Sequence, residues 1–292
     1  MPLSFGPVLL EQEHDYRRRL SVCPQVSSDY SFVNLWSWAE VHGLEWAWEA
    51  DLVWIRQRSA DAHIQWAPIG DWAAVDWHTK RDLLSAFGRF DRVPQALADR
   101  WAALPSPPRK IQPRRGHWDY LYEAASLATL RGNRLHKKKN LVNQFIRNHD
   151  FTYVPFGGEM IGMARDLQMD WCLWRDCESS ETLSAENLAI EKTLAHWERL
   201  TGLSGGAIMV GDALAAYTIA EALTEEMVVI HFEKADTNFK GAYQAINQMY
   251  VESIQDTFSV VNREQDLDDD GLRKAKLSYN PIGYIEKAEV RF

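Results

Sequence analysis

A histidine and a glutamate lie two residues apart in a segment whose pattern predicts a β-strand. In Met227–Lys234 the side chains alternate, which places His231 and Glu233 on one face together with Val229. A histidine beside a carboxylate can remove a proton from an amine or a hydroxyl group, so this pair is the candidate catalytic pair. The alternative is a core histidine with satisfied hydrogen bonds next to a surface acid.

Positive charge gathers in the segment RGNRLHKKKN, at the predicted start of a helix. The chain as a whole is acidic, with a formal net charge of −9, so this local excess of bases is unusual. The bases could seat the phosphate of a tRNA end or of a phospholipid head group, and the alternative is a solvated helix face. Bases at a helix start oppose the helix dipole, which favours a bound anion. The residues concerned are Arg131, Arg134, Lys137, Lys138 and Lys139.

A block of acids runs directly into a block of bases in NREQDLDDDGLRKAKLSYNP. The polar residues Asn262, Arg263 and Glu264 begin where a predicted strand leaves the core. The acids Asp268–Asp270 are expected to form a solvated turn that favours the start of a short helix near Gly271–Ser278. That helix and the residue after it present Arg273, Lys274, Lys276 and Tyr279.

The sequence lacks several signatures of common enzyme classes. The G-x-S-x-G, H-E-x-x-H, Walker A and dinucleotide-binding patterns are missing, which argues against a common hydrolase, a zincin, an NTPase or a Rossmann enzyme. Cys23, Cys172 and Cys177 form no C-x-x-C pair, so we expect reduced thiols and no metal site. No stretch reaches the ~20 apolar residues of a membrane helix and the N-terminus does not resemble a signal peptide, so a cytoplasmic protein is expected.

The first hundred residues predict one α+β unit. Ser28 and Asp29 are candidate N-caps of a helix over Tyr30–Val41. The segments LEWAWEA, DLVWIRQ and HIQWAPI predict an antiparallel meander, and helical spacing returns in Asp76–Phe87 and Pro94–Leu104. The tryptophans in this region are interleaved with acids, which favours packing in the core and on a sheet face.

The proline-rich stretch Leu104–Gly116 is the predicted linker, because proline cannot occupy interior helix or strand positions. It divides the chain into expected domains at residues 1–112 and 113–292. In the second domain we predict helices, a three-strand meander over residues 205–236, and then a helix, a strand, a short helix and a strand. This order is that of an acetyltransferase-like (GNAT) fold, and the first half follows a shorter version of the same plan.

Four sequence blocks carry a resemblance to a known family. They are SDYSFVNLWSW, LRGNRLHKKKNLVNQF, HFEKADTNFKGAYQAIN and NREQDLDDDGLRKAKLSYNP, which span nearly the whole chain. In this order they resemble the soluble bacterial proteins that share the C-terminal domain of phosphatidylglycerol lysyltransferases. The resemblance implies two tandem GNAT-like domains with mixed sheets flanked by helices, related to the Fem transferases. It also implies a transfer reaction that uses aminoacyl-tRNA as donor. The resemblance further implies that Asn262, Arg263 and Glu264 border the cleft of this site.

The region that would hold acetyl-CoA in a GNAT enzyme departs from the usual Q/R-x-x-G-x-G/A pattern. Gly241 fits the pattern, and a helix start near Lys240 and Gly241 could still hold a phosphate or a carboxylate. Asn238 replaces the usual Gln or Arg, however, and Tyr243 fills a position that should be small. We therefore expect weak binding of acetyl-CoA or none.

The preferred hypothesis is an aminoacyl-tRNA-dependent acyltransferase in which His231 or Glu233 takes a proton from an amine or hydroxyl acceptor, such as a lipid head group. Phosphate groups would be held by five bases, Lys137, Lys138, Lys139, Arg273 and Lys276. The other expected substrate-binding residues are Lys240, Gly241, Tyr243, Asn262, Arg263 and Glu264. No cofactor is required in this hypothesis, and the expected partners are a tRNA acceptor end and an anionic lipid or small-molecule acceptor. The alternatives are a CoA-dependent N-acyltransferase and a binding module without turnover on the same fold.

Overall fold

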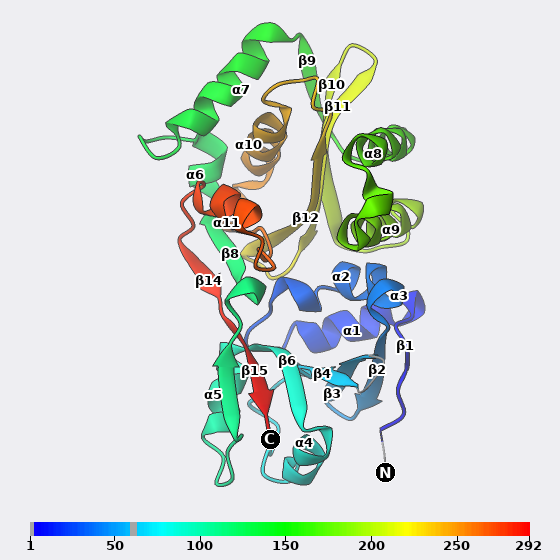
Figure 1. Ribbon diagram of the computed structural model, residues 1–292, viewed down its shortest axis with the longest axis vertical. Coiled ribbons are helices and arrows are strands. Elements are labelled where there is room, and N and C mark those ends of the chain that lie inside the picture. The colour runs from blue at the N-terminus through cyan, green and yellow to red at the C-terminus, as the bar shows by residue number, and fades with distance from the viewer. Residues whose placement is uncertain (1–2, 59–62) are drawn as a thin grey trace. The chain divides into compact units, whose positions relative to one another are not determined.

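The computed structural model of the chain describes residues 3–58 and 63–292. The chain forms two compact units, each with its own sheet (Figure 1). The first unit consists of Met1–Asp119, Gln265–Asp269 and Tyr284–Phe292, and the second of Tyr120–Glu264 and Asp270–Gly283. Each sheet combines parallel and antiparallel pairs and is flanked by helices, which confirms the predicted architecture.

The first unit is built on an eight-stranded sheet with the order β1-β2-β3-β4-β6-β15-β7, with β5 paired to β3. The predicted meander is confirmed, because β2, β3 and β4 pair antiparallel, and β4 is parallel to β6. The strands are β1 (Gly6–Pro7), β2 (Leu44–Glu49), β3 (Leu52–Gln57), β4 (Ile64–Trp66), β5 (Ile69–Gly70), β6 (Arg89–Pro94), β7 (Lys110–Pro113) and β15 (Lys287–Arg291).

The helices of the first unit are shorter than the sequence suggested. The predicted helix over Tyr30–Val41 is divided into two short helices. The N-cap of the first is Ser31 rather than Ser28 or Asp29, because the Ser31 hydroxyl accepts a hydrogen bond from the backbone N–H of Asn34. The α-helices are α1 (Glu13–Leu20), α2 (Phe32–Ser37), α3 (Ala39–His42), α4 (Arg81–Phe87) and α5 (Gln95–Ala102). Short 3₁₀ turns are η1 (Leu10–Gln12), η2 (Ser28–Tyr30) and η3 (Arg115–His117).

The proline-rich stretch is not a free linker. Its residues Lys110–Pro113 form β7, which pairs antiparallel with β15 from the C-terminus of the chain. Because β7 is an edge strand, Pro113 can be tolerated there without a backbone N–H. The first unit therefore takes a strand from residues 284–292, which the expected division at residue 112 had assigned to the second domain.

The second unit is built on a seven-stranded sheet with the order β14-β8-β13-β12-β11-β10-β9. The predicted meander is confirmed as β10, β11 and β12, and β12 continues into a parallel pair with β13. In Figure 1, α8 and α9 cover one face of this sheet and α10 covers the other. The strands are β8 (Asp119–Glu123), β9 (Phe151–Pro155), β10 (Leu203–Val210), β11 (Ala213–Ala222), β12 (Met227–Ala235), β13 (Val260–Asn262) and β14 (Gly283–Ile285).

The helices predicted for the second unit are present, with bounds that differ by a few residues. They are α7 (His136–Asn148), α8 (Met160–Arg175), α9 (Glu181–Ala195), α10 (Ala242–Ile254) and α11 (Asp270–Leu277). The sequence did not predict α6 (Ala124–Thr129) or the 3₁₀ turn η4 (Cys177–Ser179). After α8 the chain turns at Asp176, which has a left-handed backbone, and this brings the Cα atoms of Cys172 and Cys177 to 5.0 Å. These two cysteines form a disulfide, so the expectation of reduced thiols is wrong for this pair.

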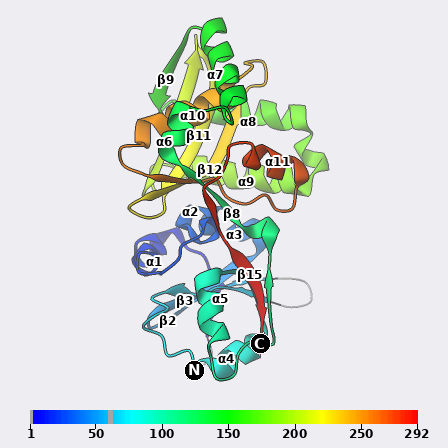
Figure 2. The same cartoon turned by 90° about the vertical axis from the view of Figure 1, so that its left-hand side faces the viewer.

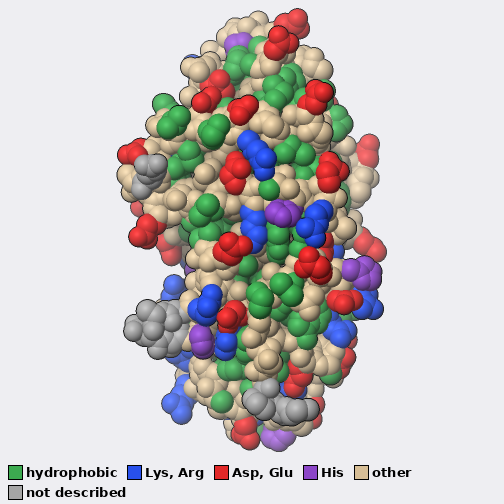
Figure 3. All heavy atoms as spheres, turned by 90° about the vertical axis from the view of Figure 1, so that its right-hand side faces the viewer, with side chains coloured by type: hydrophobic (Ala, Val, Ile, Leu, Met, Phe, Trp, Pro, Cys, Tyr) green, Lys and Arg blue, Asp and Glu red, His purple; other side chains and the backbone are tan. Residues whose placement is uncertain are grey.

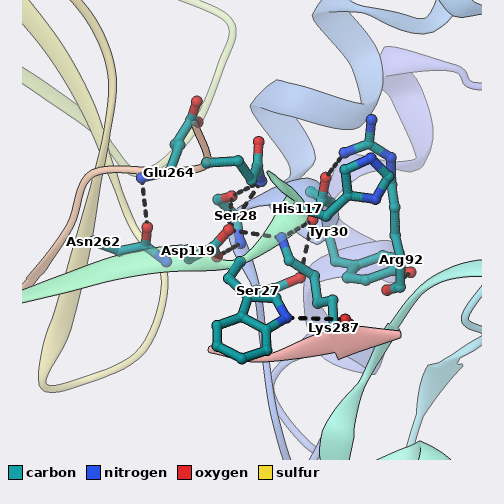
Figure 4. A network of polar contacts seen from close by, with 12 residues as sticks. Ser27, Ser28, Tyr30, Arg92, His117, Asp119, Asn262, Glu264 and Lys287 are labelled. Atoms are coloured by element: carbon teal, nitrogen blue, oxygen red, sulfur yellow. Dashed lines mark hydrogen bonds and ion pairs between the residues drawn. The ribbon is translucent and has the colours of Figure 1, made fainter. Parts of the chain in front are cut away.

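A buried ionic network ties the segments of the first unit together (Figure 4). The Lys287 ammonium on β15 donates to Asp119, at 2.7 Å, and to Asp29. Arg92 also donates to Asp29, and the backbone N–H of Ser28 donates to Asp119 at 2.7 Å. Burial would raise the pKa of Asp29, but the charges of Lys287 and Arg92 hold it well below its usual value. Asp29 is therefore charged at neutral pH, and both carboxylates share the Lys287 ammonium as a partner.

Gly241 has a packing role at the start of α10. Its φ is +95°, a conformation that side chains disfavour, and an added Cβ would lie 2.3 Å from the carbonyl oxygen of Leu141 on α7. The missing side chain therefore allows α10 to approach α7.

We predict that Lys287→Met lowers the free energy of unfolding by about 3–5 kcal/mol, because it leaves two buried carboxylates without their shared cation. Chemical denaturation measures this loss. Lys110→Met on the exposed edge strand is the control and should change stability little, and adding Asp29→Asn and Asp119→Asn to Lys287→Met should recover part of the loss. A loss below about 1 kcal/mol would contradict the role assigned to Lys287.

We predict that Gly241→Ala destabilises the protein more than Gly211→Ala does. Both glycines have positive φ, but an added Cβ at Gly211 meets nothing within 4 Å. Gly211→Ala should cost about 1–2 kcal/mol through backbone strain alone, and Gly241→Ala roughly 1–3 kcal/mol more through the clash with α7. Equal losses in denaturant unfolding would show that the contact with Leu141 relaxes at no cost.

Candidate functional site

The strands β12 and β13 separate after three paired residues. Their parallel register runs from Met227 opposite Val260 to Val229 opposite Asn262. The antiparallel pairing of β13 with β8 continues beyond this point, since the Arg263 N–H donates to the Tyr120 carbonyl at 2.9 Å. The side chains that follow Val229 and Asn262 therefore lie where the two strands part.

An irregularity at His231 changes which face each side chain of β12 occupies. In the pairing with β11, Ile230 lies opposite Ala220 and Phe232 opposite Ile219, so His231 is the extra residue of a β-bulge. Glu233 lies opposite Thr218, and Val229 lies opposite Glu221. Thr218 and Glu221 are three positions apart on β11, so Glu233 and Val229 lie on opposite faces of the sheet. The prediction that Val229, His231 and Glu233 share one face is wrong, because a bulge interrupts the alternation.

His231 is held between two carboxylates. Its side chain is fully buried, with Nε2 3.0 Å from Glu221 Oε2 and Nδ1 2.9 Å from Glu264 Oε1. Burial alone would lower the pKa of the imidazole, but the hydrogen bonds to Glu221 and Glu264 outweigh it and raise the pKa to about 9. At neutral pH His231 is therefore an imidazolium that donates through both nitrogens, and it has no lone pair with which to take a proton.

Glu233 and Arg263 form a second ion pair on the face covered by α10. Arg263 Nη2 lies 3.2 Å from Glu233 Oε1, and the side-chain amide of Asn247 on α10 donates to Glu233 Oε2 at 2.9 Å. The other polar atoms of these two partners, Arg263 Nη1 and Asn247 Oδ1, have no hydrogen-bond partner within the described part of the chain. A hydrogen-bond donor on Arg263 and an acceptor on Asn247 thus lie on the two residues that contact the Glu233 carboxylate.

Glu264 has a backbone conformation that few residues with side chains adopt. Its φ is +56°, and its N–H donates to the buried side chain of Asn262 at 2.8 Å (Figure 4). Such a conformation costs of order 1–3 kcal/mol and occurs mainly where the surrounding structure fixes it. Glu264 retains 23% side-chain exposure, while its partner His231 has none. Its carboxylate is therefore fixed in position and still accessible.

Lys138 on α7 and Arg263 contact the same tyrosine ring. Lys138 Nζ lies 4.4 Å and the Arg263 guanidinium carbon 4.6 Å from the centroid of Tyr279. Burial and the nearby charge of Arg263 lower the pKa of Lys138. Lys276 joins this group, since its ammonium donates to the backbone carbonyl of Arg263. Two cations held close together in this way favour a bound anion.

The remaining predicted site residues lie elsewhere. Lys137, Lys139 and Lys240 are exposed, and Arg273 is half-buried on α11. Gly241 serves helix packing, and the Tyr243 hydroxyl accepts the Trp171 indole N–H at 3.0 Å. The structure thus brings together His231, Glu233, Asn262, Arg263, Glu264, Lys138 and Lys276 from the predicted set.

Sequence reasoning missed Glu221 and Asn247. Glu221 is a charged residue near the end of the apolar strand ALAAYTIAEA, and Asn247 is a buried amide in the apolar helix α10. Both could have been noticed as polar residues at positions where the pattern predicts burial, since buried polar groups need partners.

The described part of the chain offers no group of three or more His, Cys, Asp or Glu side chains arranged to hold a metal ion. Within residues 3–58 and 63–292, none of the helices has the length and apolar character needed to cross a bilayer.

Two solved structures share the fold over nearly the whole chain at low sequence identity. L-PGS from Bacillus licheniformis aligns with a TM-score of 0.63 and 10% identity, covering 95% of this chain and 91% of that one. FemX aligns with a TM-score of 0.52 and 8% identity, covering 99% and 98%. The chain therefore has a tandem GNAT-like fold, as predicted.

Two proteins without an assigned function are also similar. A conserved protein of unknown function from Bacteroides thetaiotaomicron has 27% identity and a TM-score of 0.89, with both chains covered completely. An uncharacterized protein of Mycoplasmoides gallisepticum is 23% identical over 177 residues, which is 59% of this chain and only 56% of that relative's length.

The family described as phosphatidylglycerol lysyltransferase, C-terminal, matches residues 21–287. Because this match covers most of the chain and all the residues gathered around His231 and Glu233, the chain belongs to the phosphatidylglycerol lysyltransferase C-terminal family.

Proposed function

We propose that the chain is an acyltransferase of the aminoacyl-tRNA-dependent type. It would move an aminoacyl group to an amine or hydroxyl acceptor, a lipid head group among the candidates. The observation that carries the proposal is the accessible Glu264 carboxylate, which an imidazolium and a strained backbone hold where β12 and β13 part. Membership of the family supports the transfer chemistry.

In the proposed reaction Glu264 accepts the proton of the attacking group. The nitrogen or oxygen of the acceptor forms a bond to the carbonyl carbon of the aminoacyl ester, and the bond from that carbon to the tRNA ribose oxygen breaks. The proton taken by Glu264 passes to this ribose oxygen, so the carboxylate is regenerated. His231 positions Glu264 through its 2.9 Å hydrogen bond and does not itself take the proton.

The second ion pair provides polar contacts for the donor. Arg263 Nη1 can donate to a carbonyl or phosphate oxygen, and Asn247 Oδ1 can accept from an ammonium group. Lys138 and Lys276 add positive charge near Arg263 for a phosphate or carboxylate. A ligand between the parted strands would meet Arg263 and Glu264 together, because they are neighbours in the chain.

Two observations make acetyl-CoA the less favoured donor. The backbone of Gly241 packs closely against Leu141 at the start of α10. The Tyr243 ring lies in the first turn of the same helix, and its hydroxyl is hydrogen-bonded to the Trp171 indole. The pyrophosphate of CoA would need the backbone N–H groups at this helix start.

We predict that Glu264→Gln lowers kcat for transfer by about 10²–10⁴-fold, because the amide cannot accept the proton. The assay supplies tRNA charged with labelled amino acids, acetyl-CoA as an alternative donor, and phosphatidylglycerol vesicles or small amines as acceptors. Glu225→Gln, in the exposed turn before β12, is the matched control and should keep full activity.

Three results would count against the proposal. Unchanged kcat in Glu264→Gln would remove its role as the base. Acylation by acetyl-CoA, with none from charged tRNA, would favour the CoA-dependent alternative. No transfer from any donor would favour a binding module.

We predict that His231 titrates near pH 9 and stays protonated through neutral pH, as its hydrogen bonds to two carboxylates require. NMR of the full chain, with His231→Gln used to assign the signal, measures this value. The stability that depends on the charge is complete below the ordinary pKa of 6.5 and is lost as the pH rises through about 9, so the free energy of unfolding should fall over that range. His231→Gln should lack this fall, and a titration at or below pH 6.5 would contradict the arrangement.

A further inference from the structure

The start of α7 and the loop after α11 form one continuous surface of the second unit. Arg134 Nη1 donates to Asn280 Oδ1 at 2.7 Å, and Lys138 Nζ lies 4.4 Å from the ring centroid of Tyr279. The loop itself is ordered by a turn in which the Asn280 N–H donates to the Leu277 carbonyl. Both helices face the viewer in Figure 2. We call this region the α7–α11 surface.

The α7–α11 surface is strongly basic although the chain is acidic. The acids nearest to it in sequence are Asp269 and Asp270, at the N-terminal end of α11, and the exposed Glu286, which follows the loop. Local positive charge of this kind attracts an anionic partner. The exposed bases of the α7–α11 surface are Arg131, Arg134, Lys137, Lys139 and Lys274.

Large aliphatic side chains are exposed among these bases. Leu277 is 45% exposed and Ile282 is 60% exposed, on either side of Asn280, which binds Arg134. Lys274 precedes Leu277 by three residues and so lies on the same side of α11. Aliphatic and basic side chains are thus presented together by α11 and the loop that follows it.

We infer that the α7–α11 surface docks on an anionic phospholipid bilayer. The bases contact the lipid phosphates, while Leu277 and Ile282 enter the boundary between head groups and acyl chains. The inference does not depend on the proposed transfer reaction, because it concerns only where the protein is held.

The exposed apolar groups favour a bilayer over RNA. Single-stranded RNA is bound largely by stacking of bases on aromatic side chains. Among the described residues of this surface, the large exposed apolar side chains are Leu272, Leu277 and Ile282, all aliphatic, whereas Tyr279 is buried. Aliphatic side chains gain little from bases but are stabilised by hydrocarbon.

Another exposed apolar region lies on α8 and α9, on the side shown in Figure 3. Leu173 and Met169 belong to it, but the exposed acids Asp166, Asp170 and Asp176 are close to them in sequence. Negative charge of this kind opposes an anionic bilayer, so this region provides a matched control.

The test is sedimentation of the full chain with vesicles of phosphatidylcholine alone or mixed with phosphatidylglycerol. We expect binding to the mixed vesicles that weakens as salt rises. A charge variant, Lys137→Gln with Lys139→Gln and Lys274→Gln, should bind at least tenfold more weakly. An apolar variant, Leu277→Ser with Ile282→Ser, should also lose at least tenfold.

Control variants remove the same groups elsewhere. Arg100→Gln with Arg109→Gln and Lys110→Gln removes the same charge from exposed positions of the first unit, and Met169→Ser with Leu173→Ser removes apolar groups from α8. Both should bind like the wild type. Absence of binding to the mixed vesicles, or equal losses in test and control variants, would overturn the inference. If the charge variant loses binding of tRNA while vesicle binding is unchanged, the surface is an RNA surface instead.

Discussion

The separation of β12 from β13 determines where polar side chains can gather in the second unit. A strand that leaves its neighbour must find other partners for its backbone groups. Here the Arg263 N–H donates to the Tyr120 carbonyl, the Tyr120 N–H donates to the Glu264 carbonyl, and the Glu264 N–H donates to the Asn262 side chain. The segment after β13 is therefore fixed by β8, and its side chains can turn toward β12 without a backbone ladder between them.

The charged groups at this point are arranged in pairs on the two faces of the sheet. His231 and Glu264 meet on one face, and Glu233 and Arg263 on the other. Buried pairs of this kind contribute little net stability, since desolvation offsets the attraction, but removing one partner is costly. These pairs fix the orientation of their side chains more than they stabilise the fold. The Lys287 network has the same character in the first unit, where one ammonium serves two carboxylates.

Much of the fold could be predicted from the sequence, because the meanders and the long helices follow simple hydrophobic periods. The strand β7 could not, since its partner β15 lies about 175 residues away and pairing compensates for its prolines. For the candidate site, the sequence drew attention to His231, Glu233, Arg263 and Glu264, but it did not predict their hydrogen-bond partners. The bulge at His231 depends on the register with β11, and no local pattern specifies it. In the sequence Lys137, Lys138 and Lys139 form one basic group. Only the tertiary contact with the Tyr279 ring distinguishes Lys138 from the exposed Lys137 and Lys139.

The role of the histidine follows from its partners rather than from its type. A histidine with one free nitrogen and a pKa near neutrality can exchange protons, which is why the sequence suggested a base. Two carboxylates change this, because they stabilise the charged form and occupy both nitrogens. The fixed positive charge then holds the Glu264 carboxylate in one place, while part of the Glu264 side chain remains exposed. The strained backbone at Glu264 also holds the carboxylate in one orientation. A carboxylate that is already oriented loses less conformational entropy when it engages a substrate.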